Sequence, residues 1–137
     1  MAKFSSLFSE GTNLRTLIPY VLAATVLIVI AFIIGISDNL PGIILLYIGI
    51  FVLVYGFTHQ WKEWKKFRKL LITSIIGIFA FTILHNLFYG ISKEFEDVSI
   101  VQNLSNWLGV ASFIISVLIC PVTIVIGLWG WIKNKHK

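Results

Sequence analysis

Four long apolar stretches constrain this chain more than any other feature of its sequence. They cover approximately residues 16–36, 42–58, 70–91 and 105–132, and none of them contains Asp, Glu, Lys or Arg. A helix that crosses a bilayer needs about 20 mostly apolar residues, and its backbone hydrogen bonds are satisfied within the helix itself. The sequence therefore predicts an all-α integral membrane protein, with four transmembrane helices packed as an antiparallel bundle in a single domain, residues 1–137.

The composition agrees with a membrane protein and offers little for catalysis. The chain is 58% hydrophobic and 12% charged, whereas soluble domains contain about 25% charged residues. Its one cysteine, Cys120, allows neither an internal disulfide nor a CxxC motif. No hydrolase elbow, HExxH motif or phosphate loop is present, and His59 and His85 fall at different depths, which excludes joint ligation of one haem iron. We therefore expect a non-enzymatic protein with no cofactor and no metal.

The basic residues are distributed unevenly between the two sides of the predicted membrane. With four spans, both termini and the 59–69 loop share one side, and the 92–103 loop lies on the other. Of the 11 Lys and Arg residues, only Lys93 falls on the second side, where acidic residues outnumber it. Cytoplasmic loops collect Lys and Arg, so we expect both termini in the cytoplasm. The small size and simple signals favour the plasma membrane of a prokaryote.

Aromatic and basic residues alternate in the stretch FTHQWKEWKKFRKL, residues 57–70. At a helical step of 100°, Phe57, Trp61 and Trp64 share one face. Tryptophan rings favour the headgroup layer, and each Lys or Arg near an anionic leaflet contributes about 1 kcal/mol. A short loop tied to two spans leaves no platform for nucleic acid. We predict a membrane-interface anchor that contacts the anionic inner leaflet, formed by Trp61, Lys62, Trp64, Lys65, Lys66, Arg68, Lys69, Trp129 and Trp131. A dedicated lipid or protein docking site is the alternative.

A stripe of polar side chains follows one face of the third apolar stretch. Its members are Ser74, Thr82, His85, Asn86 and Tyr89. Polar groups within a span pack against other helices or mark functional sites, so the stripe is expected to face helices rather than lipid. Two interpretations of His85 stay open: a neutral ring hydrogen-bonded to another helix, or a proton or ligand site, since histidine can change charge near neutral pH.

The fourth stretch carries a proline near its centre. Cys120 and Pro121 lie in mid-span, and a proline there removes one backbone hydrogen bond and bends the helix. The sequence predicts a kink at this point, with Cys120 as a small buried apolar residue.

These observations favour a role in assembly rather than in chemistry. The leading hypothesis is a small multi-pass accessory or scaffold subunit that binds copies of itself or another membrane subunit. The alternative is an oligomeric channel or transporter in which the stripe around His85 lines the path. An immunity or membrane-stress protein is a third hypothesis, which the sequence does not separate from the first.

Overall fold

The computed structural model describes residues 13–36, 39–95 and 99–135, and helices account for all the regular structure in these ranges. The helices are α2 (Leu14–Ile34), α3 (Leu40–Thr58), α4 (Trp64–Glu94), α5 (Ser99–Ile114), the π-helical turn η1 (Ile115–Ile119) and α6 (Cys120–Lys135). Because α5, η1 and α6 follow one another without a break, they form one long helix, Ser99–Lys135. The structure confirms the prediction of an all-helical chain with four helices long and apolar enough to span a membrane.

The third and fourth helices extend beyond the predicted apolar stretches. Helix α4 continues to Glu94 and α5 begins at Ser99, so the prediction of a long loop over 92–103 is wrong. Phe95 follows α4, and residues 96–98 lie outside the described residues. A hydropathy pattern marks only the segment that prefers hydrocarbon, whereas backbone hydrogen bonds carry the helix on into polar sequence.

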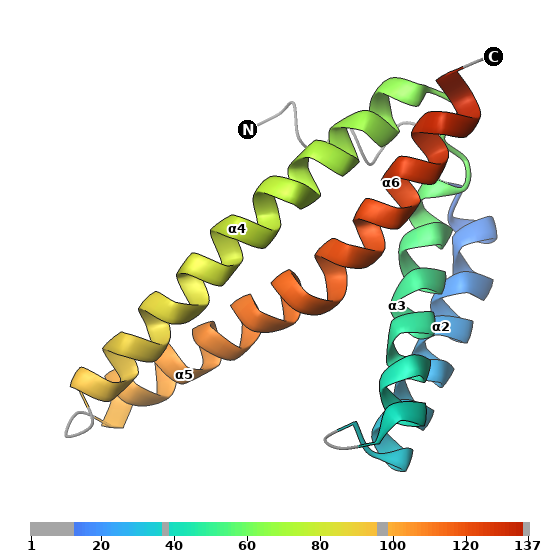
Figure 1. Ribbon diagram of the computed structural model, residues 1–137. Coiled ribbons are helices and arrows are strands. Elements are labelled where there is room, and N and C mark those ends of the chain that lie inside the picture. The colour runs from blue at the N-terminus through green and yellow to red at the C-terminus, as the bar shows by residue number, and fades with distance from the viewer. Residues whose placement is uncertain (1–12, 37–38, 96–98, 136–137) are drawn as a thin grey trace.

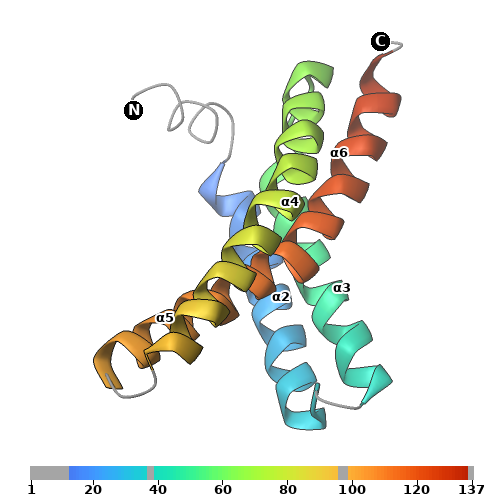
Figure 2. The same ribbon diagram turned by 60° about the vertical axis from the view of Figure 1, so that its left-hand side comes forward.

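The four long helices are arranged as two pairs (Figure 1). Helix α2 packs along α3, and α4 packs along α5 and α6. The pairs touch where α3 approaches η1 and α6. From that contact they diverge, so the end of α2 with the start of α3 lies apart from the end of α4 with the start of α5 (Figure 2). We call the end formed by the start of α4 and the end of α6 the joined end.

Small residues allow the first pair to pack closely. The contact residues recur at intervals of seven: Gly42, Gly49 and Gly56 on α3, and Leu17, Ala24 and Ala31 on α2. A Cβ atom at Gly49 would lie 2.8 Å from a side-chain carbon of Ile28, and one at Gly56 would lie 2.5 Å from Tyr20. Helices associate closely in lipid through such small residues.

In the second pair, small residues also line the contact surface between the helices, and this surface is longer. We call the contact surface within each pair its seam. The long helix buries a row of small residues, namely Ser105, Gly109, Ser112, Ser116, Cys120, Thr123, Gly127 and Gly130. A Cβ atom at Gly127 would lie 3.0 Å from the backbone nitrogen of Leu71, and one at Gly130 would overlap the Phe67 ring. Steps of four and three residues alternate along this row, except at residues 112, 116 and 120, which are separated by two successive steps of four. The π-helical turn lies at this point. This wider turn keeps the row facing α4.

The position of the predicted kink, Cys120 and Pro121, directly follows η1, Ile115–Ile119. The N–H of Cys120 donates to the carbonyl of Ile115, five residues earlier. Pro121 has no N–H, so it cannot donate to the carbonyl of Val117, which lies four residues before it. The Tyr47 hydroxyl of α3 donates to that carbonyl over 2.9 Å. A carbonyl freed by proline thus becomes the hydrogen-bonded link between the two pairs.

Candidate functional site

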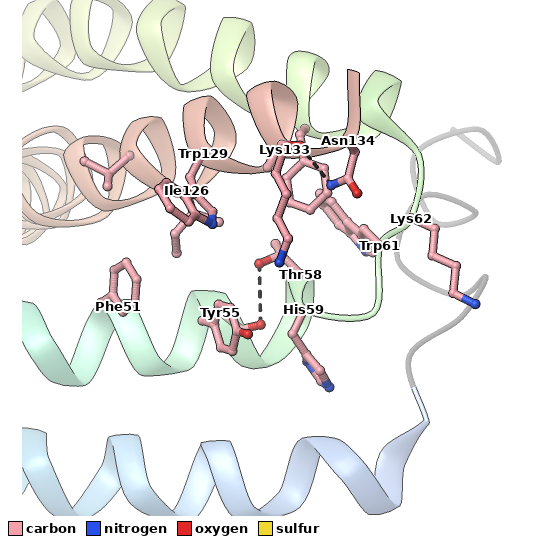
Figure 3. A pocket seen from close by; sticks show the side chains of 13 residues that line it. Phe51, Tyr55, Thr58, His59, Trp61, Lys62, Ile126, Trp129, Lys133 and Asn134 are labelled. Carbon is pink, nitrogen blue, oxygen red and sulfur yellow. Dashed lines mark hydrogen bonds between the residues drawn. The ribbon is translucent and has the colours of Figure 1, made fainter. Parts of the chain in front are cut away.

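A cavity of about 440 Å³ lies at the joined end, between the end of α3, the segment 59–63 and the end of α6 (Figure 3). Aromatic and basic side chains surround it, among them Phe51, Tyr55, His59, Trp61, Lys62, Trp129 and Lys133. Several of these residues belong to the predicted interface anchor. The structure gathers residues from distant parts of the chain around one concave surface.

The cavity exists because α3 ends at Thr58 rather than continuing into the basic stretch. The Thr58 hydroxyl donates to the Val54 carbonyl at 3.0 Å, and residues 61–63 are outside any helix. The prediction that Phe57, Trp61 and Trp64 share a helical face is therefore wrong. The break turns Trp61 inward, where its ring meets that of buried Phe67 edge-on at a centroid distance of 5.5 Å.

The four tryptophans of the predicted anchor occupy two kinds of environment. Trp129 is 70% exposed. Trp61 and Trp131 are half-buried against the apolar core cluster, and Trp64 lies under the Arg68 guanidinium, 4.8 Å from the ring centroid. Periodicity alone did not distinguish these environments. The burial of Trp61 and Trp131 depends on the contact between α6 and the start of α4, which the sequence pattern does not reveal.

Most of the predicted basic anchor points outward. Lys62, Lys65, Arg68 and Lys69 are exposed, and Lys66 forms an ion pair with Glu63 at 3.7 Å. Figure 3 shows Lys62 directed away from the cavity. These side chains present a basic surface around the outside of the joined end.

Lys133 differs from the other basic residues in its position. It extends from α6 into the space beside α3 (Figure 3). Within the described residues, no carboxylate forms an ion pair with Lys133, since Glu63 at this end is paired with Lys66. Among the described residues, the positive charge of Lys133 beside the aromatic rings therefore has no ion-pair partner.

A second cavity of about 400 Å³ continues from the first along the contact between α3 and α6. It is lined by Tyr47, Ile48, Phe51, Pro121, Val122 and Val125. Phe51 and Val125 also line the first cavity. The two cavities therefore form a groove with a basic, aromatic end and an almost wholly apolar extension, which we call the α3–α6 groove.

The structure separates the predicted polar stripe into two groups. Ser74 and His85 lie in the seam of the second pair. The Ser74 hydroxyl donates to the Thr123 hydroxyl at 2.6 Å, and Thr123 is within 2.9 Å of the Cys120 carbonyl. The His85 Nδ1 lies 2.9 Å from the Gly109 carbonyl oxygen, so Nδ1 carries the proton and donates it. Sequence reasoning missed Thr123, although its spacing from Cys120 and Gly127 places it on the small-residue row.

Thr82, Asn86 and Tyr89 instead lie on an exposed flank of α4, which we call the polar flank. Tyr89 is 57% exposed, and among the described residues the Asn86 amide donates to the Thr82 carbonyl of its own helix, at 2.9 Å. At 100° per residue this flank lies roughly a quarter-turn from the seam. The polar flank is therefore available to a partner, and His85 is not part of it.

A metal centre or a known relative would give a direct indication of function. Among the described residues, no group of three or more His, Cys, Asp or Glu side chains is close enough to hold a metal ion. Comparison with protein-family models, curated proteins and solved structures finds no match to this chain. The fold thus defines a class, a helical protein with four helices suited to a membrane, and its role has to be argued from its own surfaces.

Proposed function

We propose that all four helices cross a prokaryotic plasma membrane in antiparallel order, with both termini in the cytoplasm. The basic start of α4 and the end of α6, which carries Lys133 and Lys135, lie at the same end (Figure 1). The opposite end of α4 carries Lys93 and Glu94. The positive-inside rule supports a cytoplasmic position for the joined end. In this arrangement the two pairs form one bundle only near the inner leaflet.

Within that membrane the protein acts as a non-catalytic accessory or scaffold subunit. The observation that carries this proposal is the polar flank, Thr82, Asn86 and Tyr89, which is exposed on an apolar helix. A polar side chain in a span is costly against lipid and normally finds a partner helix. Both seams are filled by the chain's own residues. The polar side chains of the flank therefore find their partners on another membrane subunit or on a second copy of this chain.

The assembly test replaces polar atoms on the polar flank without changing the seam. We expect Thr82→Val combined with Asn86→Leu to release the partner subunit from the complex. The measurement is native mass spectrometry of the protein extracted from its own membrane in a lipid-preserving system.

Thr73→Val is the matched control, because Thr73 is exposed on the opposite flank of α4. It should leave the complex intact. Full retention of the partner by the double variant, with unchanged helix content, would contradict the proposed subunit role of this surface.

The polar flank also supports a second candidate, an oligomeric channel or transporter. If several copies associate through α4, Thr82 and Asn86 line the space between them. His85, whose ring donates into the α4–α5 seam, then supports the wall rather than lining the path. A homo-oligomer as the sole extracted species, together with solute flux that falls in the double variant, would favour this candidate over the accessory subunit.

A further inference from the structure

We propose that the α3–α6 groove is a binding site for one anionic phospholipid of the inner leaflet. The phosphate lies at Lys133, and one acyl chain follows the apolar extension towards Pro121. The site is separate from the polar flank of α4, so the inference is independent of the proposed subunit role, although it rests on the proposed orientation in the membrane. It differs from the general attraction of the basic surface to the leaflet, because it assigns a particular lipid position.

The first step concerns the headgroup. Lys133 faces the cavity without an ion-pair partner among the described residues. The Lys133 side chain is exposed, so its ammonium can meet an anionic headgroup at the mouth of the cavity. The aromatic rings beside it favour an anion that brings its own apolar surface. Basic pockets between transmembrane helices on the cytoplasmic side are established sites for anionic lipid headgroups.

The second step concerns the acyl chain. Beyond Phe51 and Val125, which line both cavities, the groove is walled by aliphatic carbon from Ile48 and Val122. Tyr47 also lines this part of the groove, and its hydroxyl already donates to the Val117 carbonyl. A hydrocarbon chain leaves no polar group unpaired here, whereas a peptide would introduce backbone N–H and C=O groups that the wall cannot satisfy.

The third step compares the order of surfaces along the groove with the order of chemical groups in a phospholipid. The basic end of the groove is at the joined end, and the apolar extension runs from there along α3 and α6 towards the middle of the chain's spans. A phospholipid of the inner leaflet has the same order, with phosphate at the surface and hydrocarbon below it. Charge complementarity and the sequence of surfaces along the groove therefore point to the same ligand.

The test measures lipid binding to the purified full-length protein by native mass spectrometry. Phosphatidylglycerol and phosphatidylcholine with identical acyl chains are titrated separately. We expect a first phosphatidylglycerol to bind more tightly than phosphatidylcholine. Lys133→Gln should weaken phosphatidylglycerol binding about fivefold, the loss expected for one basic contact, and leave phosphatidylcholine binding nearly unchanged.

Two variants distinguish lipid binding in the groove from general electrostatic attraction of lipid to the basic surface. Lys69→Gln removes an exposed charge of the same end that does not line the groove, and we expect almost no loss. Val125→Trp fills the point shared by the two cavities, and it should weaken binding of both lipids. Val125 is 58% exposed, so the larger side chain need not disturb the core, which helix content by circular dichroism checks.

Two results would overturn the proposal. Equal losses for Lys133→Gln and Lys69→Gln would show that binding depends on overall charge. Unchanged lipid binding in Val125→Trp, or a dimer that this substitution dissociates, would show that the groove does not hold lipid. These results concern the isolated protein, so they leave the assembly experiment on the polar flank unaffected.

Discussion

At the scale of single residues, Pro121 and Tyr47 form the most informative contact in the molecule. Proline removes the donor for the Val117 carbonyl, and the Tyr47 hydroxyl supplies one from another helix at 2.9 Å. An interhelical hydrogen bond in a membrane contributes roughly 0.5–1.5 kcal/mol. The bond also joins the two pairs at a point where few other residues do so.

We expect Tyr47→Phe to lower the free energy of unfolding by about 1 kcal/mol. Tyr55→Phe, eight residues along the same helix, is the control, because no hydrogen bond joins the Tyr55 hydroxyl to another described residue. Unfolding in mixed detergent micelles, followed by circular dichroism, measures both variants.

The same bond makes a second prediction through a double-mutant cycle. Pro121→Ala restores an N–H that reaches the Val117 carbonyl, so Tyr47→Phe should lose less stability in that background than in the native chain. Equal losses in the two backgrounds would show that the tyrosine acts by packing and not by replacing the missing helix donor.

At the scale of elements, each pair depends on small residues in its seam. Glycine is unfavourable inside a helix by roughly 0.5–1 kcal/mol relative to alanine. Its repeated use on α3 and α6 is explained by the space that a Cβ atom would need, as at Gly49 and Gly127. Packing between helices, rather than helix propensity, therefore determines these positions.

We expect Gly130→Ala to destabilise the protein by about 1–3 kcal/mol, because the new Cβ atom overlaps the packed Phe67 ring. Gly90→Ala is the matched control in α4, since nothing lies within 4 Å of its added Cβ atom, and it should be neutral or slightly stabilising. Unfolding curves recorded under identical micelle conditions make the comparison. Similar losses for the two variants would rule out seam packing as the cause.

At the scale of the whole molecule, the distribution of charge determines how the chain is expected to sit in a membrane. The described residues at the joined end include many lysines and arginines, whereas the other end of α4 carries Lys93 and Glu94. Because of this asymmetry, we expect the two ends of α4 to lie on opposite sides of the membrane.

We predict these exposures for single cysteines placed in a Cys120→Ala background. Glu94→Cys should react with a membrane-impermeant maleimide in intact cells, because the proposed orientation places it outside. Lys65→Cys should react only after the membrane is permeabilised. The reverse pattern would place the joined end outside the cell and contradict the cytoplasmic position of Lys133.

The sequence anticipated some parts of the candidate site better than others. Its basic and aromatic composition was evident from Trp61, Lys62, Trp129 and the residues around them. The groove itself was not evident, because it requires α3 to end at Thr58 and α6 to lie beside it. Likewise, periodicity placed His85 with Asn86 on one stripe, although the partner helix covers only the former.

The number of apolar helices and the concentration of basic residues at one end followed from sequence alone. Both depend on properties local to each segment, namely the transfer of side chains to hydrocarbon and the pairing of backbone groups within a helix. The pairing of helices, the Tyr47–Val117 bond and the α3–α6 groove required the tertiary structure. They depend on which side chains meet across helices, and the close approach of small residues at Gly127 and Gly130 determines those contacts.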